Sequence, residues 1–166
     1  MNLRVVNIGL SPNNTWKDTL VALSQIILPW NWLSWKKGGA RHELDRKFAE
    51  WLGVEKSYAV GSGREGLYVI LKSLGLQEGD EIILQSFTCM VVVNSIVWAG
   101  FKPVFVDIDE TYNLDANKLA EKIGPRTKAV MVQHTFGVSA DLEKVARICR
   151  EKKLILIEDC AHAMGA

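Results

Sequence analysis

The sequence lacks long apolar runs, has few cysteines and carries almost no net charge, and each absence excludes a class of protein. No apolar run reaches the roughly 20 residues of a membrane-spanning helix, and the start lacks the basic and apolar regions of a signal peptide. Cys89, Cys149 and Cys160 are odd in number and lack CxxC spacing, which favours reduced thiols in a cytoplasmic protein. A formal charge of +1 gives no indication of a nucleic-acid partner.

The composition is that of a globular chain long enough for one substantial core, with 166 residues of which 48% are hydrophobic. Residues 1–40 are expected to form an N-terminal arm, in which Trp16 to Leu28 has helical spacing and a tryptophan-rich segment from Pro29 to Gly39 follows. Tryptophans beside Lys36 and Lys37 would suit a membrane interface. Packing on a partner subunit or on the rest of the chain explains the same residues and is favoured, so membrane binding is not expected.

From residue 41 to residue 166, helical and strand patterns alternate. The expected strands are Ser57–Val60, Glu81–Gln85, Pro103–Val106, Ala129–Val132 and Leu154–Ile157. The expected helices are 41–52, one opening at Gly61–Gly66 and running to Leu74, Thr88–Ala99, one capped by Asp115 and ending at Lys122, and Asp141–Glu151. Such alternation implies right-handed crossovers. The predicted fold class is therefore α/β, with three α/β/α layers and a mainly parallel sheet.

The segment Gly61-Ser62-Gly63-Arg64 lies between a predicted strand and a predicted helix. Free backbone N–H groups and the helix dipole make such a place an anion site. The segment is not a Walker motif, although residues 61–66 fit the dinucleotide pattern G-x-G-x-x-G. A nicotinamide-binding domain would need an acid near Gln85, where none stands, so this alternative loses weight. A glycine-rich turn without a ligand also remains open.

Two carboxylates, a thiol and an imidazole follow the last predicted strand, where an apolar run ends in Glu158-Asp159-Cys160-Ala161-His162. The run suits a strand buried on both faces, and ligands of open α/β sheets bind outside the carboxyl ends of the strands. A helix cap or a solvated loop is the alternative interpretation. A phosphate site after one strand and a carboxylate after another are what pyridoxal 5'-phosphate requires, with Asp159 as the candidate partner of the pyridine nitrogen.

A succession of short motifs in this order resembles the DegT/DnrJ/StrS aminotransferases, the pyridoxal-phosphate sugar aminotransferases of fold type I. The similarity runs from about Arg41 to the last residue. The motifs that carry it are Ser62-Gly63-Arg64, Gly79–Ile83, Ser86-Phe87-Thr88, Asn94-Ser95-Ile96, Lys102–Asp109, Pro125–Ala129, His134–Gly137 and Ile157–His162.

The resemblance implies an incomplete fold type I large domain with Asp159 and His162 as catalytic residues, the latter near the phenolic oxygen of the cofactor. It places Ser62, Gly63 and Arg64 at the cofactor phosphate. Family members commonly have threonine in place of Arg64, glutamine in place of His162 and a ring-stacking aromatic residue in place of Cys89, so stacking should be weaker here. Alternation along the chain puts Phe87 on the side opposite Cys89. No residue suggests a metal site.

In the family, the Schiff-base lysine and a small C-terminal domain follow later than residue 166. The chain is therefore expected to be the N-terminal portion of a larger enzyme, with little activity alone. The resemblance implies transfer of an amino group from an amino acid, such as glutamate, to a nucleotide-linked keto sugar by a homodimer. Two alternatives stay open: a sugar dehydratase, if histidine replaces the lysine, and a non-catalytic protein used for binding or oligomerisation.

Overall fold

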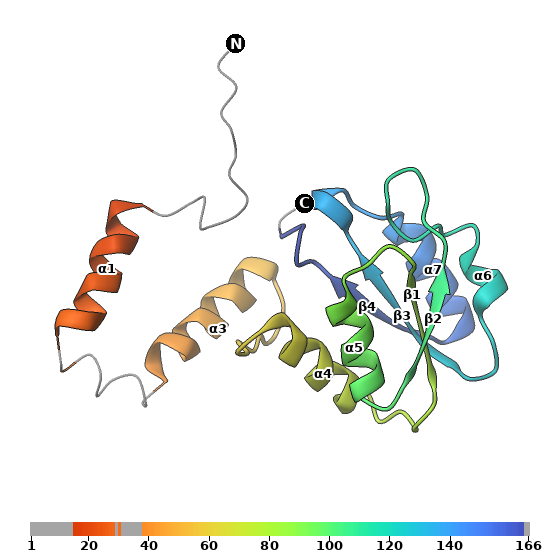
Figure 1. Cartoon of the computed structure of the whole chain (residues 1–166), viewed down its shortest axis with the longest axis horizontal. Helices are drawn as coiled ribbons and strands as arrows, with labels where there is room; N and C mark the ends of the chain where they lie inside the picture. Colours follow the sequence, from red (N-terminus) through yellow and green to blue (C-terminus); the bar gives the residue numbers. More distant parts are fainter. Residues whose placement is uncertain (1–14, 29, 31–37, 165–166) are drawn as a thin grey trace, which may run out of the picture. The chain divides into compact units, whose positions relative to one another are not determined.

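The computed structural model describes residues 15–28, 30 and 38–164 of a chain that divides into two compact units, residues 1–59 and 60–166 (Figure 1). Most of the tryptophan-rich segment from Pro29 to Gly39 lies outside the described residues. No helix in the described ranges is both long enough and apolar enough to cross a bilayer.

The first unit contains the two helices that the sequence predicts, α1 (Trp16–Ile27) and α3 (Gly39–Leu52). Helix α1 begins with a capping box, in which Thr15 Oγ1 accepts the Asp18 N–H and the Asp18 carboxylate accepts the Thr15 N–H at 2.7 Å. Helix α3 ends at Gly53, whose φ of 69° is left-handed. Both helices carry apolar stripes, yet α1 has no buried residue and α3 buries only Ala49.

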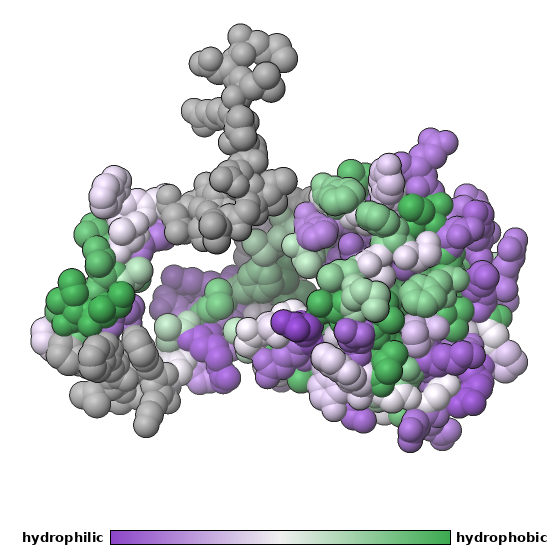
Figure 2. Space-filling view, viewed as in Figure 1, coloured by the Kyte–Doolittle hydropathy of each residue, from purple (hydrophilic) through white to green (hydrophobic). Residues whose placement is uncertain are grey.

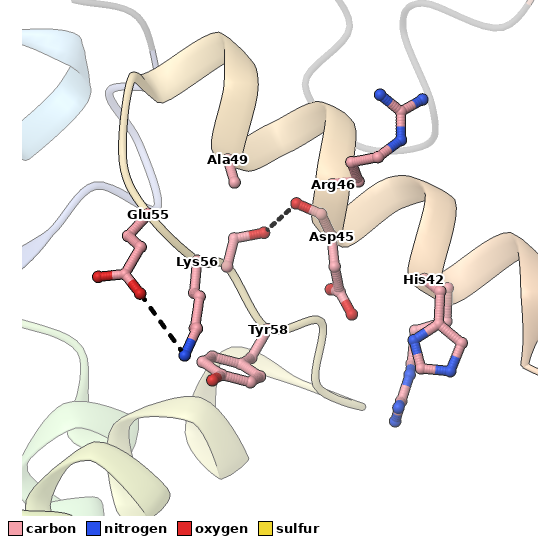
Figure 3. A pocket seen from close by; sticks show the side chains of 9 residues that line it. His42, Asp45, Arg46, Ala49, Glu55, Lys56 and Tyr58 are labelled. Carbon is pink, nitrogen blue, oxygen red and sulfur yellow. Dashed lines mark hydrogen bonds and ion pairs between the residues drawn. The ribbon is translucent and has the colours of Figure 1, made fainter.

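The strand predicted over Ser57–Val60 is wrong, because these residues form no ladder with any strand in the described part of the chain. Instead of pairing with a strand, this segment forms hydrogen bonds with the carbonyl and the carboxylate of Asp45 on α3 (Figure 3). Ser57 Oγ donates to the Asp45 carbonyl at 2.7 Å, and the Ala59 N–H donates to Asp45 Oδ1 at 2.5 Å. Residues with strand-like composition thus run as an irregular segment tied to α3.

The second unit is built on a four-stranded sheet of order β2-β1-β3-β4, in which every strand pairing is parallel. The strands are β1 (Glu81–Gln85), β2 (Lys102–Val106), β3 (Thr127–Gln133) and β4 (Ile155–Asp159). The helices are α4 (Gly63–Ser73), α5 (Met90–Trp98), α6 (Leu119–Lys122) and α7 (Leu142–Lys152), with a 3-10 turn η1 (Thr135–Gly137) after β3. The strand and helix predictions for residues 61–114 and 129–157 are confirmed within a few residues.

Alternation along the strands produces two separate hydrophobic cores, one on each face of the sheet. Ile82 and Leu84 pack with residues of α4 and α5 in the first core. Ile83, between them, packs with residues of α6 and α7 in the second. Figure 1 shows α4 and α5 on one side of the strands and α7 on the other. The predicted α/β fold with three layers is confirmed.

Two local predictions are corrected. Asp115 does not cap a helix, because α6 begins only at Leu119, and the Asp115 carboxylate instead accepts the Asn117 N–H in a tight turn. Strand β4 is not buried on both faces. It pairs with β3 alone among the described strands, so Ile155 and Leu156 are only half-buried.

Buried polar side chains fix the loops at the carboxyl ends of β1, β2 and β3. Gln85 Nε2 donates to the Tyr112 carbonyl at 3.1 Å and to Thr135 Oγ1 at 2.9 Å, while the Thr135 N–H donates to Asn113 Oδ1 at 2.7 Å. Tyr112 and Phe136 have φ values of 63° and 54°, a region that non-glycine residues adopt only when their surroundings hold them. Hydrogen bonds between buried side chains and backbone therefore tie together the loops at the carboxyl edge of the sheet.

Candidate functional site

A cavity of about 510 Å³ opens at the carboxyl ends of β3 and β4 in the second unit. Its walls contain all six residues that the sequence singles out for cofactor binding, although the roles given to them stay predictions. These residues are Ser62, Gly63, Arg64, Cys89, Asp159 and His162. Segments about 100 residues apart in the sequence thus contribute to one cavity, as expected for the carboxyl edge of a parallel sheet.

The first end of the cavity is the N-terminus of α4. Ser62 caps this helix, with its hydroxyl accepting the Glu65 N–H at 3.2 Å and its carbonyl accepting the Gly66 N–H at 3.0 Å. The N–H groups of Gly63 and Arg64 have no hydrogen-bond partner among the described residues. A Cβ added at Gly63 would meet no atom within 4 Å, so the space beside these two donors is open. Two free N–H groups at the positive end of a helix suit an anion.

The opposite end is formed by the turn after β4. Asp159 Oδ1 accepts the Ala161 N–H at 3.1 Å, which fixes the carboxylate at the end of the strand. Asp159 Oδ2 has no partner in the described part of the chain, so it is available to a cationic donor in the cavity. The His162 imidazole is nearly parallel to the Phe136 ring, at an interplanar angle of 4° and a centroid distance of 6.2 Å.

Cys89 lies between these two ends, as the N-cap residue of α5. It is exposed, and a thiol offers no ring face for stacking. Phe87 is not among the residues that line the cavity; its ring packs against Tyr112 and Phe136 with centroid distances of 5.6 and 6.2 Å. The wall near Cys89 is therefore aliphatic, with Leu67, Ile70, Val91 and Val92 among the lining residues.

Gln133 is a cavity residue that the sequence reasoning did not assign to the site. It ends β3 and is paired in register with Asp159 on β4. The signal was present in the sequence, because Gln133 is a polar residue at the end of an apolar strand, the same pattern that identified Asp159. Its burial and its contacts could not be read from that pattern.

His134, Glu158 and Cys160 bring three potential metal-ligand atoms within 4.8 Å of one another. The Ala140 N–H donates to His134 Nδ1 at 3.1 Å, so the proton of the neutral ring lies on Nε2, which faces Glu158 Oε2 at 3.4 Å. That tautomer directs a donor, not a lone pair, at the cluster. Burial, and then the carboxylates of Glu158 and Asp159, raise the pKa of the Cys160 thiol above its ordinary value.

A second cavity, of about 290 Å³, belongs to the first unit and contains no residue predicted for the site (Figure 3). It lies between α3 and the segment after it. Several of its charged side chains are paired on the surface, Arg46 with Glu50 at 2.5 Å and Lys56 with Glu55 at 3.6 Å. Exposed pairs of this kind are common without a ligand.

Known proteins are similar to this chain over most of its length. The sequence profile described as the DegT/DnrJ/EryC1/StrS aminotransferase family matches residues 17–166. A GDP-perosamine synthase of Caulobacter vibrioides is 40% identical over 125 residues, which are 75% of this chain and 34% of that protein. The chain thus spans about a third of the length of the curated relatives it matches.

Two solved structures extend the similarity to the fold. The aminotransferase from Psychrobacter cryohalolentis superimposes with a TM-score of 0.82 at 29% identity, covering 93% of this chain and 39% of that one. NtdA from Bacillus subtilis, solved with bound cofactor PMP, has a TM-score of 0.77 at 26% identity and covers 90% of this chain and 34% of that one.

Proposed function

The chain belongs to the DegT/DnrJ/EryC1/StrS aminotransferase family, and we propose that it forms the cofactor-holding part of a pyridoxal-phosphate-dependent sugar aminotransferase. One observation carries the proposal: a single cavity has the free N–H groups of Gly63 and Arg64 at one end and the fixed carboxylate of Asp159 at the other. An anion site and a carboxylate are the two features that a phosphorylated pyridine needs.

The residues present fit this cofactor. The two N–H groups at the start of α4 bind the phosphate, where open space beside Gly63 leaves room for it. Asp159, held by the Ala161 N–H, presents Oδ2 to the ring nitrogen and keeps that nitrogen protonated. A bound pyridoxal phosphate supplies an electron sink that stabilises negative charge on the substrate. His162, which also lines the cavity, would hold a hydrogen bond to the phenolic oxygen.

The names of curated relatives support the proposed substrates. These names include GDP-perosamine synthases and a dTDP-linked amino-sugar transaminase, the latter 40% identical over 130 residues. We therefore assign this chain to a protein that takes an amino group from an amino acid, with glutamate as the first candidate, and places it on a nucleotide-linked keto sugar. The protein acts as a homodimer.

Replacing Asp159 by asparagine in the full-length protein tests this function. We expect amino-group transfer to fall by more than about a hundred-fold, because a neutral partner no longer keeps the ring nitrogen protonated. Asp107→Asn is the matched control, since Asp107 also follows a strand but pairs with Lys118 at 3.0 Å and does not line the cavity. Activity is measured with a keto sugar nucleotide and glutamate, and bound cofactor by absorbance before and after borohydride.

The outcomes separate the candidate functions. Fixation of the cofactor to a lysine by borohydride, with activity lost in Asp159→Asn and retained in Asp107→Asn, supports the aminotransferase. A full-length protein with histidine in place of that lysine would indicate a sugar dehydratase. A well-folded oligomer that does not bind pyridoxal phosphate would contradict the proposal and favour a non-catalytic role.

A further inference from the structure

Gln133 is a buried residue whose side chain carries a hydrogen-bond donor without a partner among the described residues. The residue is only 8% exposed, and its Oε1 accepts the Thr88 hydroxyl at 2.7 Å. Its backbone N–H donates to Gln85 Oε1 at 3.2 Å. The side-chain Nε2 has no partner among the described residues. Every fully buried side-chain nitrogen or oxygen atom of the described residues has a hydrogen-bond partner. Because Nε2 has none, it is not fully buried, and it reaches the open space of the cavity that Gln133 lines.

The neighbours of Gln133 fix where this amide points. Thr88 occupies the oxygen side of the amide, which turns the nitrogen side away from Thr88. The parallel register places Gln133 beside Asp159, so both side chains leave their strands on the same face of the sheet and both line the cavity. A free donor and the free acceptor Asp159 Oδ2 therefore stand next to each other. An amide held in this way loses little entropy when a ligand binds.

We propose that Gln133 is a further cofactor-contact residue, whose Nε2 donates a hydrogen bond to the phenolic oxygen of the pyridoxal ring held by Asp159. The inference rests on the proposed function. The free N–H groups of α4 take the phosphate, and Asp159 takes the ring nitrogen. The phenolic oxygen is the ring acceptor that remains. As an anion it accepts two hydrogen bonds, so Gln133 shares it with His162. Thr88 is a positioning residue that acts through Gln133.

The test compares Gln133→Met with Gln77→Met in the full-length protein. Methionine matches the length of glutamine and removes the donor, while Gln77 is exposed and lies outside the cavity. Titration with pyridoxamine 5'-phosphate, which binds without a covalent bond, measures the contact directly. We expect the Kd to rise about ten-fold or more for Gln133→Met, as for loss of a hydrogen bond to a charged group, and to stay unchanged for Gln77→Met.

A second readout is the pH dependence of the absorbance of the bound cofactor. Loss of a donor to the phenolate raises the pH at which the phenol ionises, by about one unit for a ten-fold effect. Gln133→Glu keeps an acceptor for the Thr88 hydroxyl, so it tests the donor should Gln133→Met fold poorly. Thr88→Val should weaken binding less than either variant.

Each result bears on the inference. An unchanged Kd and an unchanged absorbance profile in folded Gln133→Met or Gln133→Glu, with normal binding by the wild-type protein, would overturn the role of Gln133 and leave the proposed function intact. No binding of pyridoxamine 5'-phosphate or pyridoxal phosphate by the wild-type protein would overturn both.

Discussion

Helices α1 and α7 have the same design in sequence but different surroundings in the fold. Each has an apolar stripe at helical spacing, and each begins with a side chain that caps it: Thr15 for α1 and Asp141 for α7. Helix α7 packs on the sheet and buries Val145 and Cys149 completely or nearly so. Helix α1 has no buried residue, and its aliphatic side chains are visible at the surface (Figure 2).

The difference shows what amphipathic spacing predicts and what it leaves open. Spacing predicts that a helix forms and which stripe of it is apolar. It does not identify the surface that covers the stripe. In the second unit the sheet supplies that surface on both faces. The described part of the first unit supplies no such surface for Leu20, Ile26 or Ile27, each more than 60% exposed.

The largest expected effect compares core truncation in the two units. Ile82 is fully buried in β1, so Ile82→Ala should lower the free energy of unfolding by about 3–4 kcal/mol. Leu20→Ala in α1 removes the same kind of group from a side chain that is 61% exposed and should cost less than about 0.5 kcal/mol. Denaturant unfolding of the full-length protein measures both. A cost for Leu20→Ala near that of Ile82→Ala would show that α1 is covered in solution.

A smaller effect is expected for the two helix caps. Asp141 accepts the Lys144 N–H at 3.2 Å, and its replacement by alanine should destabilise the second unit by about 1 kcal/mol. Thr15→Ala removes the equivalent cap from α1. We expect faster amide hydrogen exchange in α1 and no change in the unfolding midpoint of the second unit. A shift of that midpoint by Thr15→Ala would mean that α1 and the sheet unfold together.

The smallest effect concerns the thiols, all of which lie in the second unit and report on that unit alone. The pKa of Cys160 is raised by burial and by Glu158 and Asp159, so its alkylation rate should increase as the pH rises through that raised value. Glu158→Gln removes one negative neighbour, lowers the pKa and should speed alkylation at pH 8 by less than about ten-fold. Rates come from mass spectrometry of each peptide. An unchanged rate in Glu158→Gln would show that Glu158 does not contribute to the raised pKa.

Most of the second unit could be predicted because most of its elements have a strong local signal. The runs Ile82–Leu84 and Ala129–Val132 are apolar, and Asp141 marks the start of α7. The strand prediction failed where a residue distant in the sequence, and not a neighbouring strand, provides the hydrogen-bond partners. Ser57–Val60 has strand-like residues, but the Ser57 hydroxyl and the Ala59 N–H donate hydrogen bonds to Asp45 on α3.

In the candidate site too, residues with a local sequence signal could be predicted, and a residue whose role depends on its neighbours in space could not. Ser62, Gly63, Arg64 and Asp159 could be named from the sequence, because glycine-rich helix starts and acids after apolar strands are local patterns. Gln133 could not be assigned a role, since its significance depends on what lies next to it. The register between β3 and β4, and the hydroxyl of Thr88, decide that its amide nitrogen is left free in the cavity.

The sequence by itself determined the order of helices and strands, the parallel α/β class and the family to which the chain belongs. These features depend on periodicity and on residues close together in the chain. Only the tertiary structure decided that β4 is an edge strand of the described sheet, that the described residues of the first unit bury no side chain of α1, and that Gln133 stands beside Asp159. The physical reason is that burial and hydrogen-bond satisfaction depend on neighbours in space, and no local pattern encodes which distant segment will supply them.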